Sequence, residues 1–501
     1  MRFLTSGQIK SFEAKAITDL SSSLRLINSA ANACAKELSH FGAICIFCGK
    51  GNNGADGYRI AELLRRKGSQ VYIVRVFEPG TDECRYLAGR CDEERIPSFT
   101  FKEACEGGRI PRCDAVVDAI FGIGIHGAVT GVAREAIERI NSLDAFVLSV
   151  DIPSGLDADS GAVCGSSVRA DKTVTFTAPK MGMLSGESVD CCGSIVVRRA
   201  GVPVDFNLVP DEQPFPLIEE EIVKLLPPRP RFSHKGTFGR AVMIVGSQGM
   251  MGAAAIAARA AIRSGVGLVT IVCKRGLENT VNILVPEAVV LPLEEYDIKD
   301  PALELALVGA SSVLIGCGLG RSVTAEFIAA VLDTTTAPTV IDADGLNILA
   351  ERPEILKRRN VVVTPHPLEF SRLTGISVAE IEKDRLGAAR SFVGEYGISL
   401  VLKGARTVVA EPGGALSVSL SATSALAKAG SGDALAGVIC ALCAQGLSPV
   451  GAARLGVYLH ARAGIVAGRM CGEYSATAGD IVDSLKYAFM EVSGHERQSL
   501  G

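Results

Sequence analysis

The sequence predicts an α/β protein with two unlike domains, and three observations support that class. The chain has 501 residues, a length that two large α/β domains account for. Hydrophobic residues make up 48% and charged residues 21%, so sizeable cores can form and global disorder is excluded. Short apolar segments alternate with amphipathic ones in both halves, which is typical of parallel sheets covered by helices on both faces.

In the first half, residues 8–38 predict a helix, and further helices are expected at Asp56–Arg66 and Val132–Ser142. Apolar runs of strand length lie before, between and after these helices. They predict strands at Ala43–Cys48, Val71–Phe77, Ala115–Phe121, Ala145–Val150, Val174–Thr177 and Ile195–Arg198.

A proline-rich, acidic stretch at residues 202–231 separates the halves, because proline removes hydrogen-bond donors and ends regular elements. We therefore expect one domain at residues 1–212, a linker at 213–230 and a second domain at 231–495. In the second domain, strands are predicted at Arg240–Val245, Leu268–Val272, Val313–Ile315, Thr339–Ile341, Val361–Val363 and Leu400–Leu402. A helical region from Asp433 to about Glu491 follows them.

Charge and targeting signals narrow the classes of function. With 51 basic and 55 acidic residues, the net charge of −4 argues against nucleic acid or an anionic membrane as a partner. The N-terminal residues lack the apolar region of a secretory signal, and no membrane span is apparent. We expect a cytoplasmic protein whose 15 cysteines are reduced.

Two glycine-rich turns follow predicted strands in the first half. Gly49–Leu64 (GKGNNGADGYRIAELL) opens a helix, where free backbone N–H groups attract anions; the alternative is an ordinary tight turn with Asp56 as helix cap. Gly122, Gly124 and Gly127 fit the G-x-G-x-x-G dinucleotide fingerprint, although a glycine-rich phosphate loop of another kind is at least as consistent.

A third loop, DIPSGLDADSG, begins at Asp151 after a predicted strand. Loops at the carboxyl ends of parallel strands meet at one edge of the sheet. Amide, carboxylate and hydroxyl oxygens are hard ligands that suit a cation such as K⁺ or Mg²⁺; the alternative role for each aspartate is a turn or cap. The polar site expected at this edge comprises Asn52, Asn53, Asp56, Asp118, Asp151 and Ser154.

The sharpest signal in the second half is AKAGSGDALAGV, which places Asp433 in the first turn of an apolar helix. The preceding glycine turn exposes N–H groups as an anion hole, and Asp433 is placed to deprotonate a substrate hydroxyl during phosphoryl transfer. The alternative is an ordinary helix cap.

Polar residues directly after other predicted strands support this site. Lys403 and Arg406 suit contacts with nucleotide phosphates. His366 has a structural alternative, as a core or turn histidine. The side chains expected at the same edge are Asp342, Asp344, His366 and Glu369. A Walker A sequence is missing, which disfavours P-loop chemistry.

In combination these motifs resemble the family of bifunctional NAD(P)H-hydrate repair enzymes, over about residues 1–493. Members join an NAD(P)H-hydrate epimerase domain to an ADP-dependent NAD(P)H-hydrate dehydratase domain of the ribokinase-like superfamily. The resemblance implies an N-terminal Rossmann-like three-layer sandwich and a C-terminal ribokinase-like one. The motifs that carry it are GNNGADG, VDAIFGIGIHG, DIPSGLD and TAPKMG, then HKGTFG, IDADGLN, TPHPLEF, LKGART and AGSGD.

The resemblance also implies roles for individual residues. In the epimerase half, Asn53, Asp118 and Ser154 would hold K⁺, Asp151 would contact the hydrated nicotinamide, and Lys180 would line the site. Residues implied to bind the hydrated nucleotide are Asn52, Asn53, Gly54, Ala55 and Asp56, with the phosphate loop Gly122, Ile123, Gly124, Ile125, His126, Gly127 and Ala128. In the dehydratase half, Asp433 would be the catalytic base. Residues implied to bind hydrate or nucleotide there are Ala253, Gly318, His366, Lys403, Gly404, Ala405, Arg406, Thr407 and Gly432.

The implied reaction restores NADH and NADPH from their hydrates, NADHX and NADPHX. The epimerase interconverts the R and S forms, and the dehydratase phosphorylates the S form with ADP or ATP and Mg²⁺ before phosphate leaves. Ala55 departs from the usual NNGGDG; it is unfavourable if that position needs φ > 0 and harmless in a helical turn. Ser431 and Lys428 are further departures. A homo-oligomer is expected, as is common.

Three other interpretations remain. One is a ribokinase-like small-molecule kinase whose first half only binds a ligand. A second is an oxidoreductase that uses GIGIHG as a dinucleotide fingerprint. A third is a first half that has lost catalysis and serves as a binding or assembly module.

Overall fold

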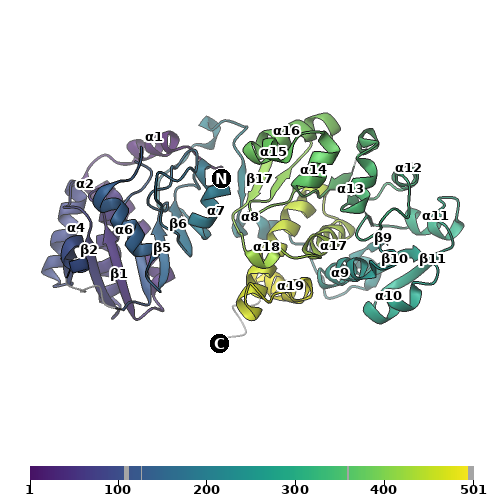
Figure 1. The fold of residues 1–501 in the computed structure, drawn as a ribbon, viewed down its shortest axis with the longest axis horizontal. Helices are drawn as coiled ribbons and strands as arrows, with labels where there is room; N and C mark the ends of the chain where they lie inside the picture. The colour runs from purple at the N-terminus through teal and green to yellow at the C-terminus, as the bar shows by residue number, and fades with distance from the viewer. Residues whose placement is uncertain (107–111, 126, 185, 358–359, 495–501) are drawn as a thin grey trace. The chain divides into compact units, whose positions relative to one another are not determined.

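The structure is a computed structural model that describes residues 1–106, 112–125, 127–184, 186–357 and 360–494. The chain divides into two compact units, Met1–Pro216 and Leu217–Gly501 (Figure 1). Each unit contains its own sheet with helices on both faces. The predicted fold class, two α/β sandwiches, is confirmed.

The first unit is built on a seven-stranded sheet in the order β3-β2-β1-β4-β5-β6-β7, in which every adjacent pair is parallel. Its strands are β1 (Ala43–Cys48), β2 (Gln70–Arg75), β3 (Ser98–Thr100), β4 (Ala115–Ala119), β5 (Phe146–Val150), β6 (Lys172–Phe176) and β7 (Ser194–Arg198). Its helices are α1 (Ser6–Ala16), α2 (Leu20–Leu38), α3 (Asn52–Arg66), α4 (Asp82–Glu93), α5 (Phe101–Glu106), α6 (Gly131–Asn141) and α7 (Gly186–Cys192). The six predicted strands are confirmed within a few residues, and β3 was not predicted.

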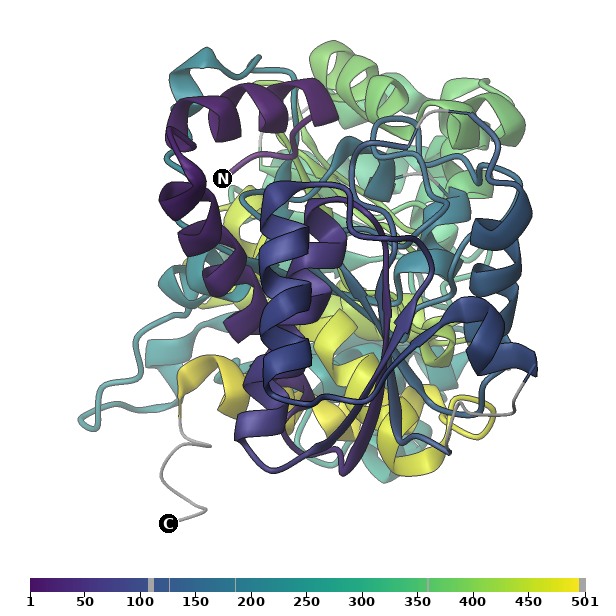
Figure 2. The same ribbon diagram turned by 90° about the vertical axis from the view of Figure 1, so that its left-hand side faces the viewer.

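Strands of this sheet are apolar without alternation because both faces are buried. Helices α2, α3 and α4 cover one face, and α5 and α6 cover the other (Figure 2). Neighbouring side chains of β1 point to opposite cores, so Cys45 and Cys48 lie on different faces.

The single helix predicted at residues 8–38 is wrong, since the structure contains two helices there. Helix α1 ends at Ala16, and α2 begins at Leu20. The break has a local cause: Asp19 accepts a hydrogen bond from the Ser22 backbone, and the Ser22 hydroxyl bonds back to the Asp19 backbone. This capping box starts a new helix.

The second unit is built on a ten-stranded sheet in the order β11-β10-β9-β12-β13-β14-β15-β16-β17-β8. Adjacent strands from β11 to β15 in this order are parallel, and β16 runs antiparallel to both β15 and β17. The bounds are β8 (Phe215–Leu217), β9 (Arg240–Ile244), β10 (Leu268–Lys274), β11 (Val289–Leu293), β12 (Ser312–Ile315), β13 (Thr339–Ile341), β14 (Val361–Val363), β15 (Ser399–Leu402), β16 (Val408–Ala410) and β17 (Leu416–Ser419). The six strands predicted for this half are confirmed, and β8, β11, β16 and β17 were not predicted.

Helices of the second unit are α8 (Glu219–Ile222), α9 (Met251–Arg263), α10 (Glu278–Leu284), α11 (Pro301–Val308), α12 (Ala325–Thr334), α13 (Asp344–Leu349), α14 (Pro367–Thr374), α15 (Val378–Lys383), α16 (Arg385–Tyr396), α17 (Ser431–Ala444), α18 (Pro449–Cys471) and α19 (Ala478–Ser493). The helical end predicted from the sequence is therefore three helices. Helix α17 lies against α9 so closely that a Cβ on Gly437 would be 2.1 Å from the carbonyl oxygen of Ala257. Glycine at this position therefore allows the middle of α17 to pack directly on the backbone of α9.

Residues 213–230, expected to be a linker, contain regular structure. Strand β8 is an edge strand of the second sheet, and Leu217 and Ile222 are buried in the second core. Proline is tolerated in an edge strand, which explains how Pro216 fits there.

None of the described helices combines the length and apolar character needed to cross a bilayer. All fifteen cysteines fall in the described part of the chain, and each is a free thiol.

Candidate active sites

The first candidate site is a cavity of about 490 Å³ at the carboxyl end of the first sheet. The loops after β1, β4 and β5 contribute to it, as the topology of a parallel sheet requires, and α1, α2 and α3 complete its wall. The predicted residues that line it are Asn52, Asn53, Asp56, Gly122, Ile123, Gly124 and Asp151.

Gly54 and Ala55 of the GNNGADG motif are not among the residues that line the cavity. Gly54 lies where a Cβ would be 2.0 Å from the carbonyl oxygen of Gly49, so only glycine allows this approach. Ala55 is fully buried in regular α3 helix, so its departure from glycine involves no left-handed backbone. The role of Asp56 as helix cap is wrong: the cap position is Gly51, without a side-chain hydrogen bond.

The Gly122–Ala128 loop does not lead directly into a helix, since α6 begins only at Gly131. The dinucleotide fingerprint needs a helix N-terminus at its glycines, so the oxidoreductase interpretation loses its geometric basis. Ile125 packs against the core beneath α6, and Gly127 adopts φ 85°. Neither these two nor Ala128 lines the cavity. His126 lies outside the described residues.

The three predicted potassium ligands form one hydrogen-bonded chain through Phe121. Asn53 Nδ2 donates to the Phe121 carbonyl oxygen at 2.9 Å. Ser154 Oγ accepts from the Phe121 N–H at 2.8 Å and donates to Asp118 Oδ1 at 2.5 Å. Asp118 Oδ2 also accepts from Ser149 Oγ and from the Ser154 N–H, each at 2.8 Å. Tertiary structure thus brings the start of α3, the end of β4 and the loop after β5 to one point.

Asp118 is fully buried, and burial raises its pKa although the hydrogen bonds from Ser154 and Ser149 lower it in part. The donor set is made of amide, carbonyl, hydroxyl and carboxylate oxygens, which a hard monovalent cation prefers. An ion would take the place of internal hydrogen bonds that Asp118 and Ser154 now make. The oxygens of Asn53, Asp118 and Ser154 therefore suit the predicted K⁺. In this structure the Asp118 carboxylate is held by hydrogen bonds from Ser149 and Ser154.

Asp151 sits in left-handed backbone with φ 68°, directly after β5. Its side chain forms an ion pair with Lys180, which is fully buried and also donates to Thr175 Oγ1 at 2.7 Å. The Phe176 N–H donates to Asp151 Oδ1 at 3.2 Å. A strained backbone and a buried cation together aim this carboxylate at the cavity, which is typical of a functional position.

Glu13 on α1 also lines this cavity, and no sequence motif pointed to it. Burial, followed by the nearby charge of Asp151, raises the pKa of Glu13 to about 7. Burial and the charges of Asp151 and Glu13 likewise raise the pKa of Asp56 well above its usual range. In the sequence, the helical spacing of Glu13 from Lys10 (i−3) and Ile17 (i+4) was the available signal that these side chains share one face of α1.

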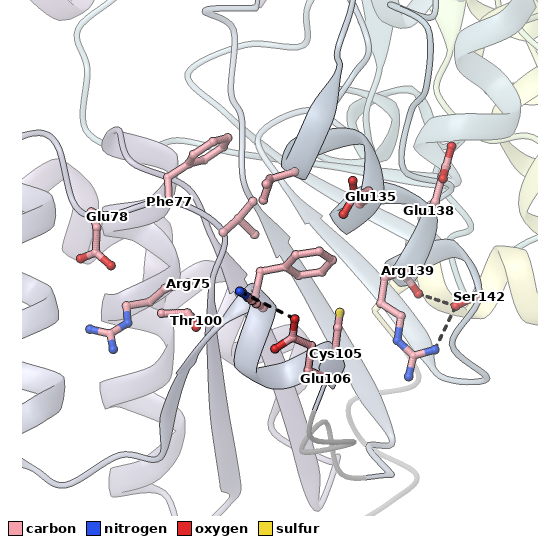
Figure 3. A pocket seen from close by; sticks show the side chains of 14 residues that line it. Arg75, Phe77, Glu78, Thr100, Cys105, Glu106, Glu135, Glu138, Arg139 and Ser142 are labelled. Carbon is pink, nitrogen blue, oxygen red and sulfur yellow. Dashed lines mark hydrogen bonds and ion pairs between the residues drawn. The ribbon is translucent and has the colours of Figure 1, made fainter.

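A second cavity of about 760 Å³ lies on the face of the first sheet covered by α5 and α6 (Figure 3). Phe77, Cys105 and Arg139 line it, and Arg139 exchanges hydrogen bonds with Ser142. None of the sequence-predicted residues lies among its lining residues.

The second candidate site is centred on the start of α17. Gly430 has φ 89°, and this left-handed turn opens the helix at Ser431. Burial, followed by the charge of Asp342, raises the pKa of Asp433 to about 6. A carboxylate with such a pKa is ionised at pH 7 yet basic enough to take a proton, as a general base requires.

Around Asp433 lie charged groups from the ends of three strands. Lys403 Nζ is 2.8 Å from Asp342 Oδ1 and 3.6 Å from Glu369 Oε2. Burial by itself would lower the pKa of Lys403, but Asp342 and Glu369 outweigh it and raise the pKa. Thr364 Oγ1 donates to Asp342 Oδ1 at 2.7 Å. The predicted polar edge is thus a connected network, and Lys403 is its cation.

Cys317 was not predicted as a member of this site. Its thiol is 3.8 Å from Asp342 Oδ2, and burial raises its pKa well above the usual range. One ligand atom each of Cys317, Asp342 and Asp433 lies within 4.8 Å of the others. Mg²⁺ prefers oxygen and usually takes few protein ligands beside substrate phosphates, so the two carboxylates fit it and the thiol does not.

Three small residues are also predicted to lie at this site. A Cβ on Gly432 would be 3.2 Å from Lys403 Nζ, so the start of α17 and this cation are close. Gly318 has φ 61°, and a Cβ there would be 2.8 Å from Ala253 Cβ. Gly432 thus lies beside Lys403, and Gly318 lies beside Ala253. Whether they contact a ligand stays a prediction.

His366 is the N-cap of α14, which agrees with its structural alternative. Its Nδ1 accepts from the N–H groups of Leu368 and Glu369 at 3.2 Å each, so Nε2 carries the proton. Burial lowers its pKa despite the opposing charge of Glu369. The predicted contact with the hydrate is therefore restricted to Nε2.

The loop from Lys403 to Thr407 is only partly available to a nucleotide. Gly404 and Ala405 are exposed, and Thr407 Oγ1 donates to the Gly404 carbonyl oxygen at 2.8 Å. Arg406 is 4% exposed, and its Nη1 donates to the Leu420 carbonyl oxygen at 2.7 Å. The structure does not support the predicted phosphate contact of Arg406, because the guanidinium stabilises the turn.

Each of the two α/β units has a polar site at the carboxyl edge of its sheet. This arrangement is that of an enzyme with two active sites. Comparisons with known proteins agree. A family model described as YjeF-related protein N-terminus matches residues 23–182, and one described as NAD(P)H-hydrate dehydratase matches residues 241–486. The chain belongs to the family of bifunctional NAD(P)H-hydrate repair enzymes.

Two curated relatives carry that name. The enzyme of Moorella thermoacetica is 36% identical over 472 residues, which are 89% of this chain and 87% of the relative. The enzyme of Escherichia coli is 36% identical over 450 residues, 88% of this chain and 84% of the relative. A solved ADP/ATP-dependent NAD(P)H-hydrate dehydratase from Bacillus subtilis, co-crystallised with ATP/Mg²⁺, is 30% identical, covers 56% of this chain and 98% of its own, and gives a TM-score of 0.47.

Proposed function

We propose that this chain repairs hydrated NADH and NADPH: its first unit epimerises the R and S hydrates, and its second dehydrates the S hydrate with ADP as phosphoryl donor. Family membership over nearly the whole chain supports both activities. The observation that carries the proposal is the position of Asp433, in the first turn of α17 and close to the carboxylate of Asp342.

In the second unit, Asp433 takes the proton of the substrate hydroxyl while its oxygen attacks the terminal phosphoryl group of ADP. The N–H groups at the start of α17 and the ammonium of Lys403 stabilise the negative charge that develops on the phosphoryl oxygens. Phosphate then leaves the substrate carbon as the ring nitrogen supplies the electron pair and forms a C=N bond. Loss of a proton from the neighbouring ring carbon returns the pair to nitrogen, forms the C=C bond and restores the reduced nicotinamide. AMP and phosphate are the other products.

Mg²⁺ would enter with the nucleotide and neutralise its phosphate charge. Asp342 and Asp433 are the carboxylates close enough to assist in holding it. In the first unit, Asn53, Asp118 and Ser154 would hold K⁺, which would supply positive charge near the substrate phosphates. The helix start at Asn52 and the Gly122–Gly124 turn would bind those phosphates through backbone N–H groups.

Asp151 is the proposed acid–base group nearest the hydrated nicotinamide, since it is the carboxylate that Lys180 holds at the cavity. A homo-oligomer acting in the cytoplasm, with NADHX or NADPHX and ADP or ATP as its small-molecule partners, completes the proposal.

The test is to incubate purified protein with a mixture of R and S hydrates of NADH, Mg²⁺, K⁺ and either ADP or ATP. Complete return of NADH absorbance with ADP is the expected result. Recovery that stops at the S fraction would contradict the epimerase assignment. No recovery with either nucleotide would contradict the dehydratase assignment and favour the small-molecule kinase.

A further inference from the structure

Helix α1 presents one side to its own core and another to the first cavity. Ile9 and Phe12 are buried with Leu4 in a small apolar cluster. Lys10 and Glu13, three residues apart, line the cavity together. Residues three apart share a helix face, so the geometry of α1 directs Glu13 toward the same space as Asp151.

The start of α1 is tied to the segment that carries Lys180. The Leu4 N–H donates to the Pro179 carbonyl oxygen at 2.9 Å, and the Met181 N–H donates to the Leu4 carbonyl oxygen at 3.0 Å. Ser6 adds two hydrogen bonds of 2.6 Å to the Asp159 carboxylate, from its backbone N–H and its hydroxyl. Helix α1 is therefore fixed relative to the Asp151–Lys180 pair.

The charged groups around Glu13 come from four places in the unit. Asp151 after β5 and burial favour its protonated form, whereas Lys180 and Lys10 oppose it. Asp56 on α3 is coupled to Glu13 as well, and Lys50 lines the same cavity. Within the described residues the Glu13 carboxyl group makes no hydrogen bond or ion pair, whereas the Asp151 carboxylate is paired with Lys180.

We propose that Glu13 is a catalytic acid of the first site and exchanges a proton with the hydroxyl of the bound hydrate. The inference rests on the proposed epimerase function and assigns its second acid–base group. Two carboxyl groups with different partners in one cavity divide the roles of acid and base: Glu13, whose carboxyl has no ion pair among the described residues, is the acid, and Asp151, paired with Lys180, is the base.

The chemistry balances without an outside reagent. Water adding to an enamine places its hydroxyl on the carbon bonded to nitrogen, so the epimeric carbon adjoins the ring nitrogen. Glu13 gives its proton to that hydroxyl, the C–O bond breaks, water leaves, and the nitrogen pair forms a C=N bond. Water then adds to the opposite face, the nitrogen regains its pair, and Asp151 takes the surplus proton. Solvent exchange returns the proton to Glu13.

The test uses the full chain with isolated R hydrate and no ADP, so that only the first unit turns over. Glu13→Gln, Glu13→Asp and the exposed control Glu93→Gln are compared with the wild type. The rate of S-hydrate formation is followed by chromatography from pH 5.5 to 9, in water enriched in oxygen-18.

We expect wild-type epimerisation to incorporate oxygen-18 and to slow as pH rises through about 7, because the acid must be protonated. Glu13→Gln is expected to slow the reaction by about 100-fold or more and to remove this pH dependence. Glu13→Asp should keep part of the rate and the alkaline decline. Dehydration of S hydrate with ADP should stay unchanged in all variants, which reports a folded chain.

A Glu13→Gln rate within threefold of the wild type overturns the inference, as does a slower variant that keeps the alkaline decline. If Glu13→Gln weakens the fold of the first unit in thermal melting, Glu13→Asp decides, and a flat pH profile in that variant also overturns it. A wild type that dehydrates S hydrate but does not epimerise overturns the proposed epimerase function itself.

Discussion

Lys403 Nζ lies 2.8 Å from Asp342 Oδ1, although 61 residues separate them along the chain. Asp342 follows β13 and Lys403 follows β15, and β14 pairs with both strands. Thr364, at the end of β14, donates to the same Asp342 oxygen. Adjacent parallel strands therefore assemble this buried pair beside Asp433.

Asp342→Asn should destabilise the second unit. The substitution leaves Lys403, whose side chain is 17% exposed, without its main counter-charge. Breaking a buried ion pair typically costs about 3–5 kcal/mol, and Glu369 at 3.6 Å keeps the loss near the lower end. Urea unfolding followed by circular dichroism should show the transition of that unit at lower denaturant.

Glu221→Gln is the matched control, because the Lys224–Glu221 pair is exposed and contributes about 0–1 kcal/mol. A midpoint for Asp342→Asn that coincides with this control would contradict the buried-pair interpretation.

Asp433→Asn should abolish dehydration while epimerisation continues. Loss of a general base lowers the rate by about 100-fold to 10,000-fold. In the wild type, the base must be ionised, so the dehydration rate should rise with pH through about 6 and then level off. Return of NADH absorbance from S hydrate and ADP at a series of pH values measures both effects.

Asp344→Asn serves as a comparison at the same edge, because Asp344 Oδ2 accepts a backbone hydrogen bond from Gly320 at 2.7 Å. It should change the rate less and keep the same pH profile. An Asp433→Asn enzyme with near-normal dehydration would refute the assigned base.

Gly318→Ala should impair the second site through the backbone. Gly318 has φ 61°, and a Cβ there would be 2.6 Å from the Met250 carbonyl oxygen. Such left-handed strain costs roughly 1–2 kcal/mol before the clash is counted. The melting temperature and the dehydration rate should both fall.

Gly252→Ala is the matched control, since a Cβ there meets nothing within 4 Å and the residue lies in the first turn of α9. Its stability should be equal to or slightly above that of the wild type. If Gly318→Ala and Gly252→Ala have the same melting temperature and dehydration rate, the close approach of Gly318 to the Met250 carbonyl oxygen is contradicted.

Replacing K⁺ with Li⁺ should slow epimerisation and leave dehydration unchanged. Asn53 and Ser154 oxygens suit the larger ion, and Ser154→Ala should weaken the response to K⁺. Stopped assays of R-to-S conversion across a K⁺ titration measure this dependence. An epimerisation rate that is the same with K⁺ and with Li⁺ would refute the proposed K⁺ ligands.

The order of apolar and amphipathic segments determined the fold class and most of the strands. Strands such as Ala43–Cys48, Thr339–Ile341 and Val361–Val363 were predictable to the residue, because burial on both faces demands continuous apolar runs. Short edge strands such as β8 and β17 were not, since their place depends on pairing with distant chain.

Site residues divide in the same way. Asp151 and Asp433 were predictable because a polar residue directly after a buried strand, or at the start of a helix, has few other reasons to be there. Asp118 lies inside β4, where a carboxylate interrupts an otherwise apolar run. Glu13 and Cys317 belong to none of the recognised motifs. Their environment is set by α1 folding back to Lys180 and by adjacent strands bringing Asp342 to Cys317.

The chain's own pattern therefore determined two α/β units with a polar edge on each, because periodicity and strand-end chemistry are local properties. Only the tertiary structure decided which charges face each other, that Arg406 turns inward, and that Glu13 shares a cavity with Asp151. The interactions between these charges depend on burial and on the distance between segments remote in sequence, and neither quantity can be inferred from the residues next to them in the chain.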